Sequence, residues 1–451
     1  MLGETIEPEI HELIDQKDFA TLKSVLAELD VHDVADLMGQ LRGDELGVVF
    51  RLLPRDRATQ VFAQLELDQQ EHLTEILSGE SLSRILNNMP PDDRTELLEE
   101  LPEDVAQRLL GTLSRDQREV AIDLLRYPEH SIGRLMTPEY VAVPAHLTVR
   151  EVLEHIRQVA PRKETLNMLF VIDGAGRLVD EIRLEDLVLA DPDAVVGDII
   201  DRHPVYLEAN EDREVAVEIF MKYDEVALPV VDEDGVLVGI VTHDDVMDVQ
   251  EEENTEDFHK MGGVGALEHP YFSTSYSTMI RKRLPCLLML SVAGIAVASA
   301  VTTFERSIGE SVFILLIFLP LLNDSAGNTG SQASALMVRG FAVHEVQLHH
   351  WPRVAYRELR IGFSLGVALA ALAMVLAFLL GRPWYIAISL GLSMTAALTV
   401  ANVVGALLPF VLKAFSLDPA VISGPLITSV MDVLTAVIYF SVGLAFLTAF
   451  G

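Results

Sequence analysis

The stretch that decides the fold is residues 421–450, VISGPLITSVMDVLTAVIYFSVGLAFLTAF, an apolar run that contains one carboxylate, Asp432. A helix needs about 20 apolar residues to cross the ~30 Å hydrocarbon core of a bilayer, so this run predicts a membrane-spanning helix. If the helix enters near Ser423, Asp432 lies roughly 14 Å inside, close to the midplane. A charge there costs at least ~2.5 kcal/mol and is usually paired, or faces water or an ion path. Asp432 is therefore the first candidate functional residue, and the alternative is a protonated Asp that caps the backbone of a neighbouring helix.

Composition divides the chain into an acidic part and a neutral apolar part. Its 451 residues are 50% hydrophobic and carry a formal net charge of −35. Residues 1–283 hold 26 basic and 61 acidic residues, whereas residues 284–451 hold seven of each. An acidic soluble region joined to a membrane region is the simplest explanation. Such a surface repels nucleic acid and attracts divalent cations, although a merely solubilising surface has the same composition.

Residues 1–130 carry the pattern of short helices. Apolar residues recur at helical spacing in segments such as 73–89, LTEILSGESLSRILNNM. Helix-start signals recur as well, at Pro90-Pro91-Asp92-Asp93, Pro102-Glu103-Asp104 and Ser114-Arg115-Asp116. Asp and Ser side chains satisfy the free backbone donors of a first helical turn, and Pro removes one of them. We expect an all-α domain of stacked helical repeats, and no catalytic constellation is visible in it.

From residue 131 the pattern changes to short strands alternating with helices, and it occurs twice. Val171-Ile172-Asp173-Gly174 in the first copy corresponds to Val230-Val231-Asp232-Glu233-Asp234-Gly235 in the second, an apolar strand followed by turn residues. A repeat of about 60 residues is specific. The two copies, residues 131–196 and 197–250, resemble a tandem pair of CBS domains. The resemblance implies an α/β sensor that commonly binds adenine nucleotides or ions and passes a shape change to an attached domain.

Residues 251–283 are expected to form a connecting helix and a linker. The helix that begins near Asp244 continues into Glu251-Glu252-Glu253-Asn254-Thr255-Glu256-Asp257. Carboxylates this dense on a helix repel one another unless cations neutralise them. An exposed linker helix is the simpler explanation, but the segment leads straight to the membrane region, which favours a cation-sensing connector.

Residues 284–451 are expected to form an α-helical membrane domain with five spans, at about 284–304, 311–338, 361–380, 385–412 and 423–450. Excess Lys and Arg marks the cytoplasmic side of a membrane. The cluster at residues 281–283 and the basic residues of the second-to-third loop, Arg339, Arg353, Arg357 and Arg360, are therefore expected in the cytosol. The N-terminus has no signal-peptide pattern, so it is expected inside and the C-terminus outside. Loop histidines, namely His344, His349 and His350, are interpreted as solvated rather than as metal ligands.

The second span carries a dense polar segment, residues 320–332, PLLNDSAGNTGSQ. Proline removes a helix hydrogen bond and glycine loosens the backbone. Polar groups at membrane depth are tolerated only where protein or water satisfies them. We expect a broken helix that offers oxygen atoms to a hydrated cation, and the alternative is a small-residue packing face.

The order of parts resembles the MgtE family of magnesium channels over essentially the whole chain. The resemblance rests on the acidic helical domain, the CBS pair, the acidic connector and five spans in that order. It is strengthened by P-x6-G-N-x-G-x-Q in the second span, from Pro320 to Gln332, and by P-L-x5-D in the fifth, from Pro425 to Asp432. It implies a homodimer in the bacterial inner membrane, with CBS domains in the cytosol and a pore on the dimer axis. Asp432 of each subunit would hold hydrated Mg²⁺ there, and such a protein is not an enzyme.

The resemblance also implies cytosolic Mg²⁺ sites that close the pore when Mg²⁺ is abundant. Carried over residue by residue, the implied ligands are Asp92, Glu96, Asp212, Glu214, Asp224, Asp245, Asp248, Glu253, Glu256, Asp257 and Asp418, with a main-chain carbonyl from Gly133. Every acidic position of the family is acidic in this chain. Asp324 and Asn328 are added as candidate cation ligands of the second span.

Two departures from the family bear on function. The family usually has an uncharged residue where this chain has Asp324, and a glycine where it has Ala326; an added carboxylate beside the pore would change ion preference or occupancy. The CBS positions that contact ATP in a relative are Glu185 and Glu225 in this chain. Carboxylates near a triphosphate are unfavourable, so the resemblance leaves ATP binding open.

Three other functions compete with a Mg²⁺ channel. A CBS-regulated carrier of Co²⁺, Mn²⁺ or Zn²⁺ would keep the same architecture, but no Cys or His lies near Asp432 or Asp324 to favour Zn²⁺. An intramembrane aspartyl enzyme would use Asp432 and Asp324 as an acid–base pair, although the acidic sensor then has no evident purpose. A CBS chloride channel is disfavoured, because five spans are too few and intramembrane acids oppose an anion.

Overall fold

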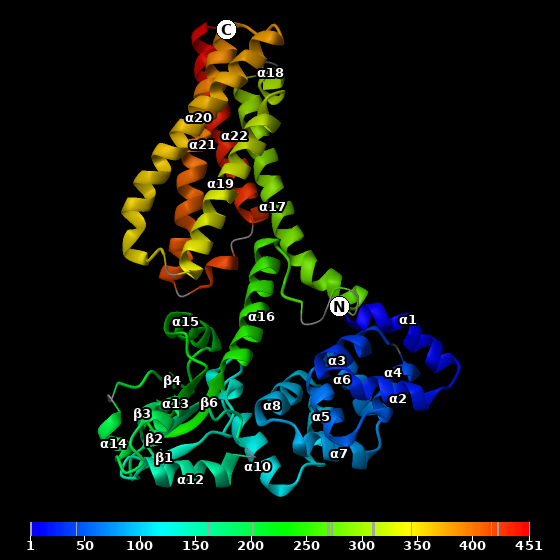
Figure 1. Ribbon diagram of the computed structural model, residues 1–451. Helices are drawn as coiled ribbons and strands as arrows, with labels where there is room; N and C mark the ends of the chain where they lie inside the picture. Colours follow the sequence, from blue (N-terminus) through cyan, green and yellow to red (C-terminus); the bar gives the residue numbers. More distant parts are fainter. Residues whose placement is uncertain are drawn as a thin grey trace. The chain divides into compact units, whose positions relative to one another are not determined.

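The computed structural model describes residues 2–41, 43–160, 163–200, 203–267, 271, 274–308, 312–343, 345–415, 417–421 and 424–450. The chain divides into two compact units, Met1–Glu252 and Glu253–Gly451 (Figure 1). Each unit is described by itself below. His344, one of the loop histidines of the sequence analysis, lies outside the described residues.

The first part of unit Met1–Glu252 consists of short helices, as expected. Side chains of Asp18, Asp30, Ser78 and Ser114 accept hydrogen bonds from the first helical turns that follow them. Apolar residues at helical spacing form one continuous core along these helices. The helices are α1 (Leu2–Asp15), α2 (Phe19–Glu28), α3 (Val31–Gln40), α4 (Asp44–Leu52), α5 (Arg55–Ala63), α6 (Leu67–Ile76), α7 (Gly79–Asn88), α8 (Pro91–Glu100), α9 (Glu103–Leu110) and α10 (Arg115–Leu124).

Two three-stranded sheets of the same topology follow, which confirms the α/β repeat. In each sheet the first strand pairs parallel to the second and the second pairs antiparallel to the third. The first copy holds α11 (Ile132–Leu135), β1 (Ala142–Pro144), α12 (Val149–Val159), β2 (Met168–Ile172), β3 (Leu178–Arg183) and α13 (Leu184–Leu189). The second holds α14 (Val196–Ile199), β4 (Leu207–Glu208), α15 (Arg213–Tyr223), β5 (Ala227–Val231) and β6 (Leu237–Thr242).

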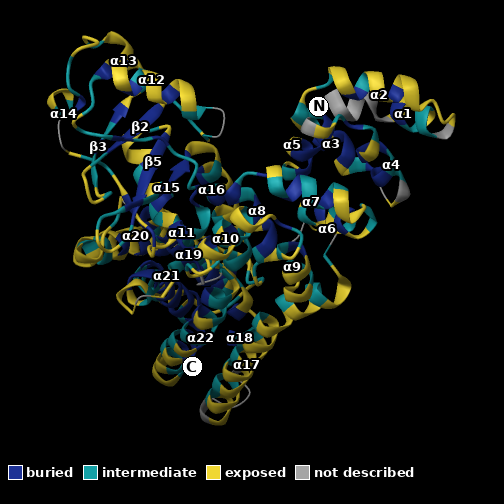
Figure 2. Cartoon of the chain, turned by 90° about the horizontal axis from the view of Figure 1, so that it is seen from below, coloured by how far each residue is buried: buried dark blue, intermediate teal, exposed yellow. Residues whose placement is uncertain are grey.

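The turns of the two copies are built alike and meet each other. Asp173 Oδ1 accepts the backbone N–H groups of Ala175 and Arg177, and Asp232 Oδ1 accepts those of Asp234 and Val236. Backbone hydrogen bonds then join the two turns, from Leu178 to Gly235 and from Leu237 to Gly176. The residues of β2 and β5 are almost all buried (Figure 2). The CBS pair is therefore one body with a pseudo-twofold arrangement.

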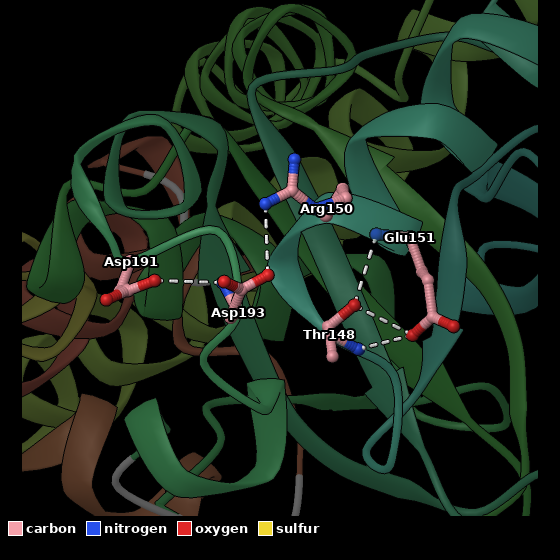
Figure 3. Close-up of polar contacts among 5 residues, drawn as sticks. All are labelled: Thr148, Arg150, Glu151, Asp191 and Asp193. Atoms are coloured by element: carbon pink, nitrogen blue, oxygen red, sulfur yellow. Dashed lines mark hydrogen bonds and ion pairs between the residues drawn. The ribbon is translucent and has the colours of Figure 1, made fainter.

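A local polar network fixes the start of α12. Thr148 and Glu151 form a capping box, with Glu151 Oε2 2.8 Å from both the backbone nitrogen and the hydroxyl of Thr148 (Figure 3). Arg150 donates to Asp193 Oδ1 at 3.0 Å, and Asp191 accepts the backbone N–H of Asp193 (Figure 3). These contacts all lie within the first copy of the repeat, and they are structural.

Helix α16 (His243–Met261) is the expected acidic connector, and it crosses the boundary between the two units. The membrane unit then holds α17 (Tyr276–Ile308), α18 (Val312–Leu316), α19 (Leu319–Ala342), α20 (Trp351–Leu379), α21 (Trp384–Ala414) and α22 (Gly424–Phe450). Helix α20 packs along α21, α19 packs against α21 and α22, and α17 packs against α22 (Figure 1). The side chains of α17 are largely exposed within one chain (Figure 2).

Among the described residues, four helices are long and apolar enough to cross a membrane: Tyr276–Arg306, Leu348–Leu379, Trp384–Ala414 and Gly424–Phe450. The expected second span is not among them, because α19 carries the polar segment 320–332. Its 24 residues nevertheless pack in the middle of the bundle, with Leu322, Ala326 and Ala333 buried.

The expected second span is interrupted, but the expectation that its polar segment forms the break is wrong. Helix α19 is continuous through the polar segment, and the interruption comes earlier, between α18 and α19 at residues 317–318. Pro320 occupies the first turn of α19, where the missing N–H costs nothing. A second correction concerns Arg353, Arg357 and Arg360, which were expected in a loop but lie in the first turns of α20.

Candidate functional site

Glycines bring the backbones of α19, α21 and α22 close together around the polar segment. A Cβ atom on Gly327 would lie 2.7 Å from Thr428 Cγ2, and one on Gly330 would lie 3.1 Å from Ile427 Cγ2. A Cβ on Gly405 of α21 would collide with the carbonyl of Gly330. The glycines of the polar segment are therefore used for close packing within a helix that stays intact.

The polar side chains of α19 are divided between two faces. Asp324, Asn328 and Gln332 are exposed and one turn apart, whereas the intervening Ala326, Gly327 and Gly330 are buried. Asn328 Nδ2 lies 3.3 Å from Asp324 Oδ1, so these two candidate ligands are together. An exposed stripe of carboxylate and amide groups on a membrane helix requires water or another protein surface. Ala326 is buried, so a methyl group is accommodated there.

Asp432 lies on the helix that packs against this segment. It is the ninth residue of α22, directly after Met431, whose side chain contacts the position of Gly330. Its own side chain is half-buried, and among the described residues it has no ion-pair partner. The placement of Asp432 well inside a membrane-length helix agrees with the sequence analysis. A carboxylate without an ion-pair partner inside a membrane is costly unless it faces water or an ion path.

A second buried polar pair in the membrane unit was missed by sequence reasoning. Glu358 of α20 is 6% exposed and accepts a hydrogen bond from Asn402 Nδ2 of α21, which lies 2.5 Å from Glu358 Oε2. The same amide also donates to the Glu358 carbonyl at 3.1 Å. The available signal was the glycine pair Gly362 and Gly366, which lets α20 and α21 approach closely at this point. The pair joins two helices and does not face α22.

In the first unit, Met1–Glu252, carboxylates of α8 face carboxylates of α16. Asp92 is 8% exposed, and burial together with the nearby charge of Asp245 raises its pKa well above the usual range. Burial and the charges of Glu164, Asp244 and Asp248 raise the pKa of Asp93 to about 7. The predicted residues Asp92 and Asp245 are thus brought together across two helices.

Glu96 and Asp248 belong to the same cluster. Although the Glu96 side chain is exposed overall, loss of water around its carboxyl group and the charge of Glu100 raise its pKa to about 8, with a further contribution from Glu252. Burial raises the pKa of Asp245 to about 7, against hydrogen bonds from Thr242 that favour its charged form. Burial and Asp244 raise the pKa of Asp248. We call Asp92, Asp93, Glu96, Asp245 and Asp248 the α8–α16 cluster.

The α8–α16 cluster is poorly neutralised. Arg94 is fully buried beside Asp92, but its Nη1 donates to the carbonyls of Leu86 and Met89 at 3.1 and 3.3 Å rather than to a carboxylate. Within the described parts of the chain, no group of three or more His, Cys, Asp or Glu side chains has the arrangement of a preformed metal site.

A smaller acidic group lies in the membrane unit, where the end of α16 meets the loop before α22. Lys260 Nζ lies 2.7 Å from Glu256 Oε1 and 2.8 Å from Asp418 Oδ2. Burial lowers the pKa of Lys260, but the hydrogen bonds to Asp418 and Glu256 raise it by more, so the ammonium stays charged. Burial and Asp418 raise the pKa of Asp257. The predicted residues Glu256, Asp257 and Asp418 therefore form one group.

Three family models match the chain. The MgtE model, described as a divalent cation transporter, matches residues 319–442, and the MgtE intracellular N domain model matches residues 29–130. The CBS domain model matches residues 132–193 and 196–252. The magnesium transporter MgtE of Thermus thermophilus is 37% identical over 99% of this chain and 100% of its own length. The chain belongs to the MgtE family.

Further relatives agree with this assignment. The magnesium transporter MgtE of Bacillus subtilis is 31% identical over 94% of this chain and 88% of its own length. A crystal structure of the cytosolic domain of the Mg²⁺ channel MgtE in complex with ATP covers 54% of this chain and 99% of its own, with 37% identity and a TM-score of 0.52. The soluble part of a magnesium transporter covers 56% of this chain and 99% of its own, with 26% identity and a TM-score of 0.51. As a member of the MgtE family with several membrane-length apolar helices, the chain is a multi-pass membrane protein.

The remaining residues carried over from the MgtE family are not gathered into one site. Asp212 caps the start of α15, accepting the backbone N–H of Glu214 at 3.0 Å, whereas Asp224 ends the same helix in a left-handed conformation with φ 55°. Residues 12 positions apart on a helix are separated by about 18 Å, so Asp224 cannot share an ion with Asp212 within one chain. Gly133 packs against the ring of Tyr127, and its N–H donates to the Ala209 carbonyl at 2.8 Å.

Glu185 and Glu225 occupy the positions expected to contact ATP by resemblance to an MgtE relative. Both carboxylates pair with the guanidinium of Arg183. Arg183 Nη2 lies 3.0 and 3.1 Å from the two carboxylate oxygens of Glu225, and its Nη1 lies 3.8 Å from Glu185 Oε1. Arg183 is placed by the end of β3, and Glu225 by the loop before β5. The sequence analysis counted the two carboxylates and missed the arginine that pairs with both.

Proposed function

We propose that this chain is a Mg²⁺ channel or transporter of the bacterial inner membrane that cytosolic Mg²⁺ closes. The observation that carries the proposal is Asp432, a carboxylate without a described counter-charge on a membrane-length helix packed against the glycines of α19. The names of the relatives and the family description support a divalent cation as the cargo. Transport of an ion, rather than catalysis, accounts for an intramembrane carboxylate without a described ion-pair partner.

Mg²⁺ suits this arrangement chemically. The ion gives up its waters reluctantly and is usually held by one or two carboxylates with several waters. In a homodimer with its pore on the twofold axis, two copies of Asp432 would supply such a site, and each would offset the desolvation of the ion they share. The exposed stripe of Asp324, Asn328 and Gln332 would line the same hydrated path.

The proposed regulation follows from the α8–α16 cluster. Its carboxylates repel one another and are partly desolvated, so a divalent cation between them stabilises the state in which α8 and α16 are in contact. A site at its dissociation constant adds about 0.4 kcal/mol to the state that binds it, so six such sites add about 2.5 kcal/mol. That energy shifts the open–closed equilibrium roughly 70-fold. Several weak sites are therefore sufficient for closure.

The proposed domain organisation assigns residues 1–130 to the helical sensor domain, 131–196 and 197–250 to the two CBS domains, 251–283 to the connector and 284–451 to the membrane domain. The basic residues near 281–283 and at the start of α20 support a cytosolic position for these ends of the helices, because Lys and Arg are enriched on that side. With α19 counted as a span, the N-terminus is cytosolic and the C-terminus lies outside.

Current recording from inside-out patches tests transport and closure together. The pipette holds Mg²⁺ and the bath bathes the cytosolic face, without Mg²⁺ or with millimolar Mg²⁺. Wild-type protein should carry Mg²⁺ current into a Mg²⁺-free bath and lose it when Mg²⁺ is added. Asp432→Asn should carry no current in either bath. Asp193→Asn, a surface acid paired only with Arg150 and Asp191, is the control and should behave as wild type. Absence of current from folded wild-type protein would refute the proposal.

A carrier of another divalent cation is the second candidate, and Asp324 is the observation that favours it. Its carboxylate lies on the exposed face of α19 one turn from Asn328 and adds an anionic ligand to the path. Replacing the pipette ion by Co²⁺ or Mn²⁺ distinguishes the two. Larger currents with Co²⁺ or Mn²⁺ than with Mg²⁺, reversed by Asp324→Asn, would assign the chain to this second class.

Regulation by ATP is proposed as a weaker possibility for the CBS pair. The ATP complex of an MgtE cytosolic domain supports it, and the guanidinium of Arg183 offers a phosphate ligand once it is released from Glu225. Binding therefore requires that the ion pair open. Titration calorimetry with ATP should give measurable binding to Glu225→Gln and much weaker binding to wild-type protein.

A further inference from the structure

Lys260 is the cation that already occupies the acidic group at the end of α16. Its ammonium nitrogen lies 2.7 Å from Glu256 Oε1, one helical turn earlier, and 2.8 Å from Asp418 Oδ2, which is 158 residues away in sequence. The side chain is only 26% exposed. A single monovalent side chain therefore links the connector to the loop that precedes α22.

The carboxylate of Asp418 is fully engaged in this arrangement. Its Oδ2 accepts from Lys260, and its Oδ1 accepts the backbone N–H of Ala420 at 2.8 Å. A metal ion that binds both Glu256 and Asp418 competes with the ammonium for these carboxylates, and its positive charge repels the ammonium. The backbone N–H is fixed by the short helix Pro419–Val421, so the ammonium is the group that moves.

Charge in this group stays unbalanced with Lys260 in place. Three carboxylates, Glu256, Asp257 and Asp418, face one ammonium, and Asp257 is half-buried next to Asp418. A monovalent cation neutralises one of the three, whereas a divalent cation neutralises two. The group is thus held together weakly by Lys260 and more strongly by an ion of higher charge.

We propose that Lys260 is a tethered substitute for the divalent cation, and that it sets the cation affinity of Glu256, Asp257 and Asp418. In the metal-free state Lys260 keeps the end of α16 in contact with the Asp418 loop. A divalent cation takes over both carboxylates and releases the ammonium to solvent. Because the lysine lies one turn after Glu256 on the same helix, its competition is intramolecular and does not depend on concentration.

Two opposite effects of removing the ammonium follow from this competition. Without metal, the end of α16 loses its only described cationic link to Asp418 and should open more often. With metal, no intramolecular competitor remains, so the Mg²⁺ concentration that closes the contact should fall. For two partly exposed ion pairs of about 0.5–1 kcal/mol each, the midpoint should fall roughly fivefold to thirtyfold. A residue with a purely structural role would weaken the contact under both conditions.

Amide hydrogen exchange of the full-length protein in nanodiscs, titrated with Mg²⁺, tests the proposal at residues 253–261. Lys260→Gln keeps the length of the side chain and removes its charge, and Lys260→Arg keeps the charge. The matched control is Lys222→Gln, which removes an exposed lysine of α15 that rests on the Tyr223 ring. Exchange of α20 and α21 in the same spectra shows whether each variant is folded.

Lys260→Gln should exchange faster than wild type at residues 253–261 without Mg²⁺, and should be protected at roughly fivefold to thirtyfold lower Mg²⁺. Lys260→Arg and Lys222→Gln should follow wild type. An unchanged midpoint in Lys260→Gln, or a midpoint moved to higher Mg²⁺, would overturn the proposal.

The link to gating rests on the proposed function, and current recording separates the two. Lys260→Gln patches should carry full Mg²⁺ current in a Mg²⁺-free bath and close at lower bath Mg²⁺ than wild type. If wild-type and variant patches both carry no current, the proposed function fails while the exchange midpoints still decide the role of Lys260. Currents that close at the wild-type Mg²⁺ concentration in Lys260→Gln would refute the proposed role of Lys260 alone.

Discussion

The α8–α16 cluster and the membrane carboxylates use the same chemical group in opposite ways. In the cluster, several carboxylates face one another across two helices, and their mutual repulsion and partial burial raise their pKa values. The carboxylates of Asp324, Glu358 and Asp432, by contrast, lie on three different helices, α19, α20 and α22. The charge density of such a cluster exists only while its two helices are in contact. The concentration of a neutralising cation is therefore expected to affect whether they stay in contact. A single carboxylate at membrane depth needs a neutralising cation whether or not another helix contacts it.

Asp432→Asn is expected to have the largest effect, and it tests whether the membrane carboxylate and the α8–α16 cluster act independently. We expect Mg²⁺ flux to fall at least about 100-fold, because the amide keeps the shape and loses the charge that offsets ion desolvation. The response of the α8–α16 cluster to Mg²⁺, followed by hydrogen exchange of α8, should stay at the wild-type midpoint. A shift of that midpoint would show that the two regions are not chemically separate.

Close packing around Gly405 gives the next largest effect. Gly405→Ala places a methyl group against the carbonyl of Gly330, and we expect the detergent-solubilised protein to lose about 2 kcal/mol of stability. Gly294→Ala on α17, where a Cβ meets nothing within 4 Å, is the matched control and should be neutral. Thermal unfolding followed by circular dichroism measures both. Equal midpoints would mean that α19 and α21 adjust easily and that the glycine contact does not position Asp432.

A triple replacement in the α8–α16 cluster, Asp92→Asn with Glu96→Gln and Asp245→Asn, tests whether the cluster acts in regulation rather than in transport. We expect closure in inside-out patches to require roughly fivefold more Mg²⁺, because weak sites of about 0.4 kcal/mol each are lost. Current in a Mg²⁺-free bath should be unchanged. The control is Asp191→Asn, which changes a surface acid of the first CBS copy. Loss of current in the Mg²⁺-free bath would place these residues in transport rather than in regulation.

Residue patterns predicted the domain order and the intramembrane Asp432, because hydrophobic run length, the CBS repeat and helix-start signals are local properties. They failed where a feature depends on partners from elsewhere in the chain. The glycines of residues 320–332 were interpreted as a break, but their function depends on Thr428, Ile427 and Gly405. Glu358 was passed over because its partner Asn402 is 44 residues away. Lys260 and Arg183 were missed for the same reason, since a charge count does not pair residues.

The smallest expected effect is a pH dependence confined to the cluster. The pKa values of Asp93, Glu96 and Asp245 are about 7 to 8 in the folded chain, and such groups titrate near pH 4 when unfolded. Between those values the folded chain holds more protons than the unfolded chain, so its stability falls as pH rises from about 4 to about 8. With solvent screening we expect about 1 kcal/mol between pH 6 and pH 8.

Hydrogen exchange of α8 in full-length protein, at pH 6 and pH 8 and corrected for the intrinsic exchange rate, measures this dependence. Without Mg²⁺, α8 should be better protected at pH 6. With saturating Mg²⁺ the difference should shrink, because the cation replaces the protons that neutralise the cluster. Exchange of α22 should show no such change, since no cluster of carboxylates is assembled there. Better protection of metal-free α8 at pH 8 than at pH 6 would mean that its carboxylates are stabilised as anions. Repulsion among them would then not separate α8 from α16, which would contradict the proposed regulation.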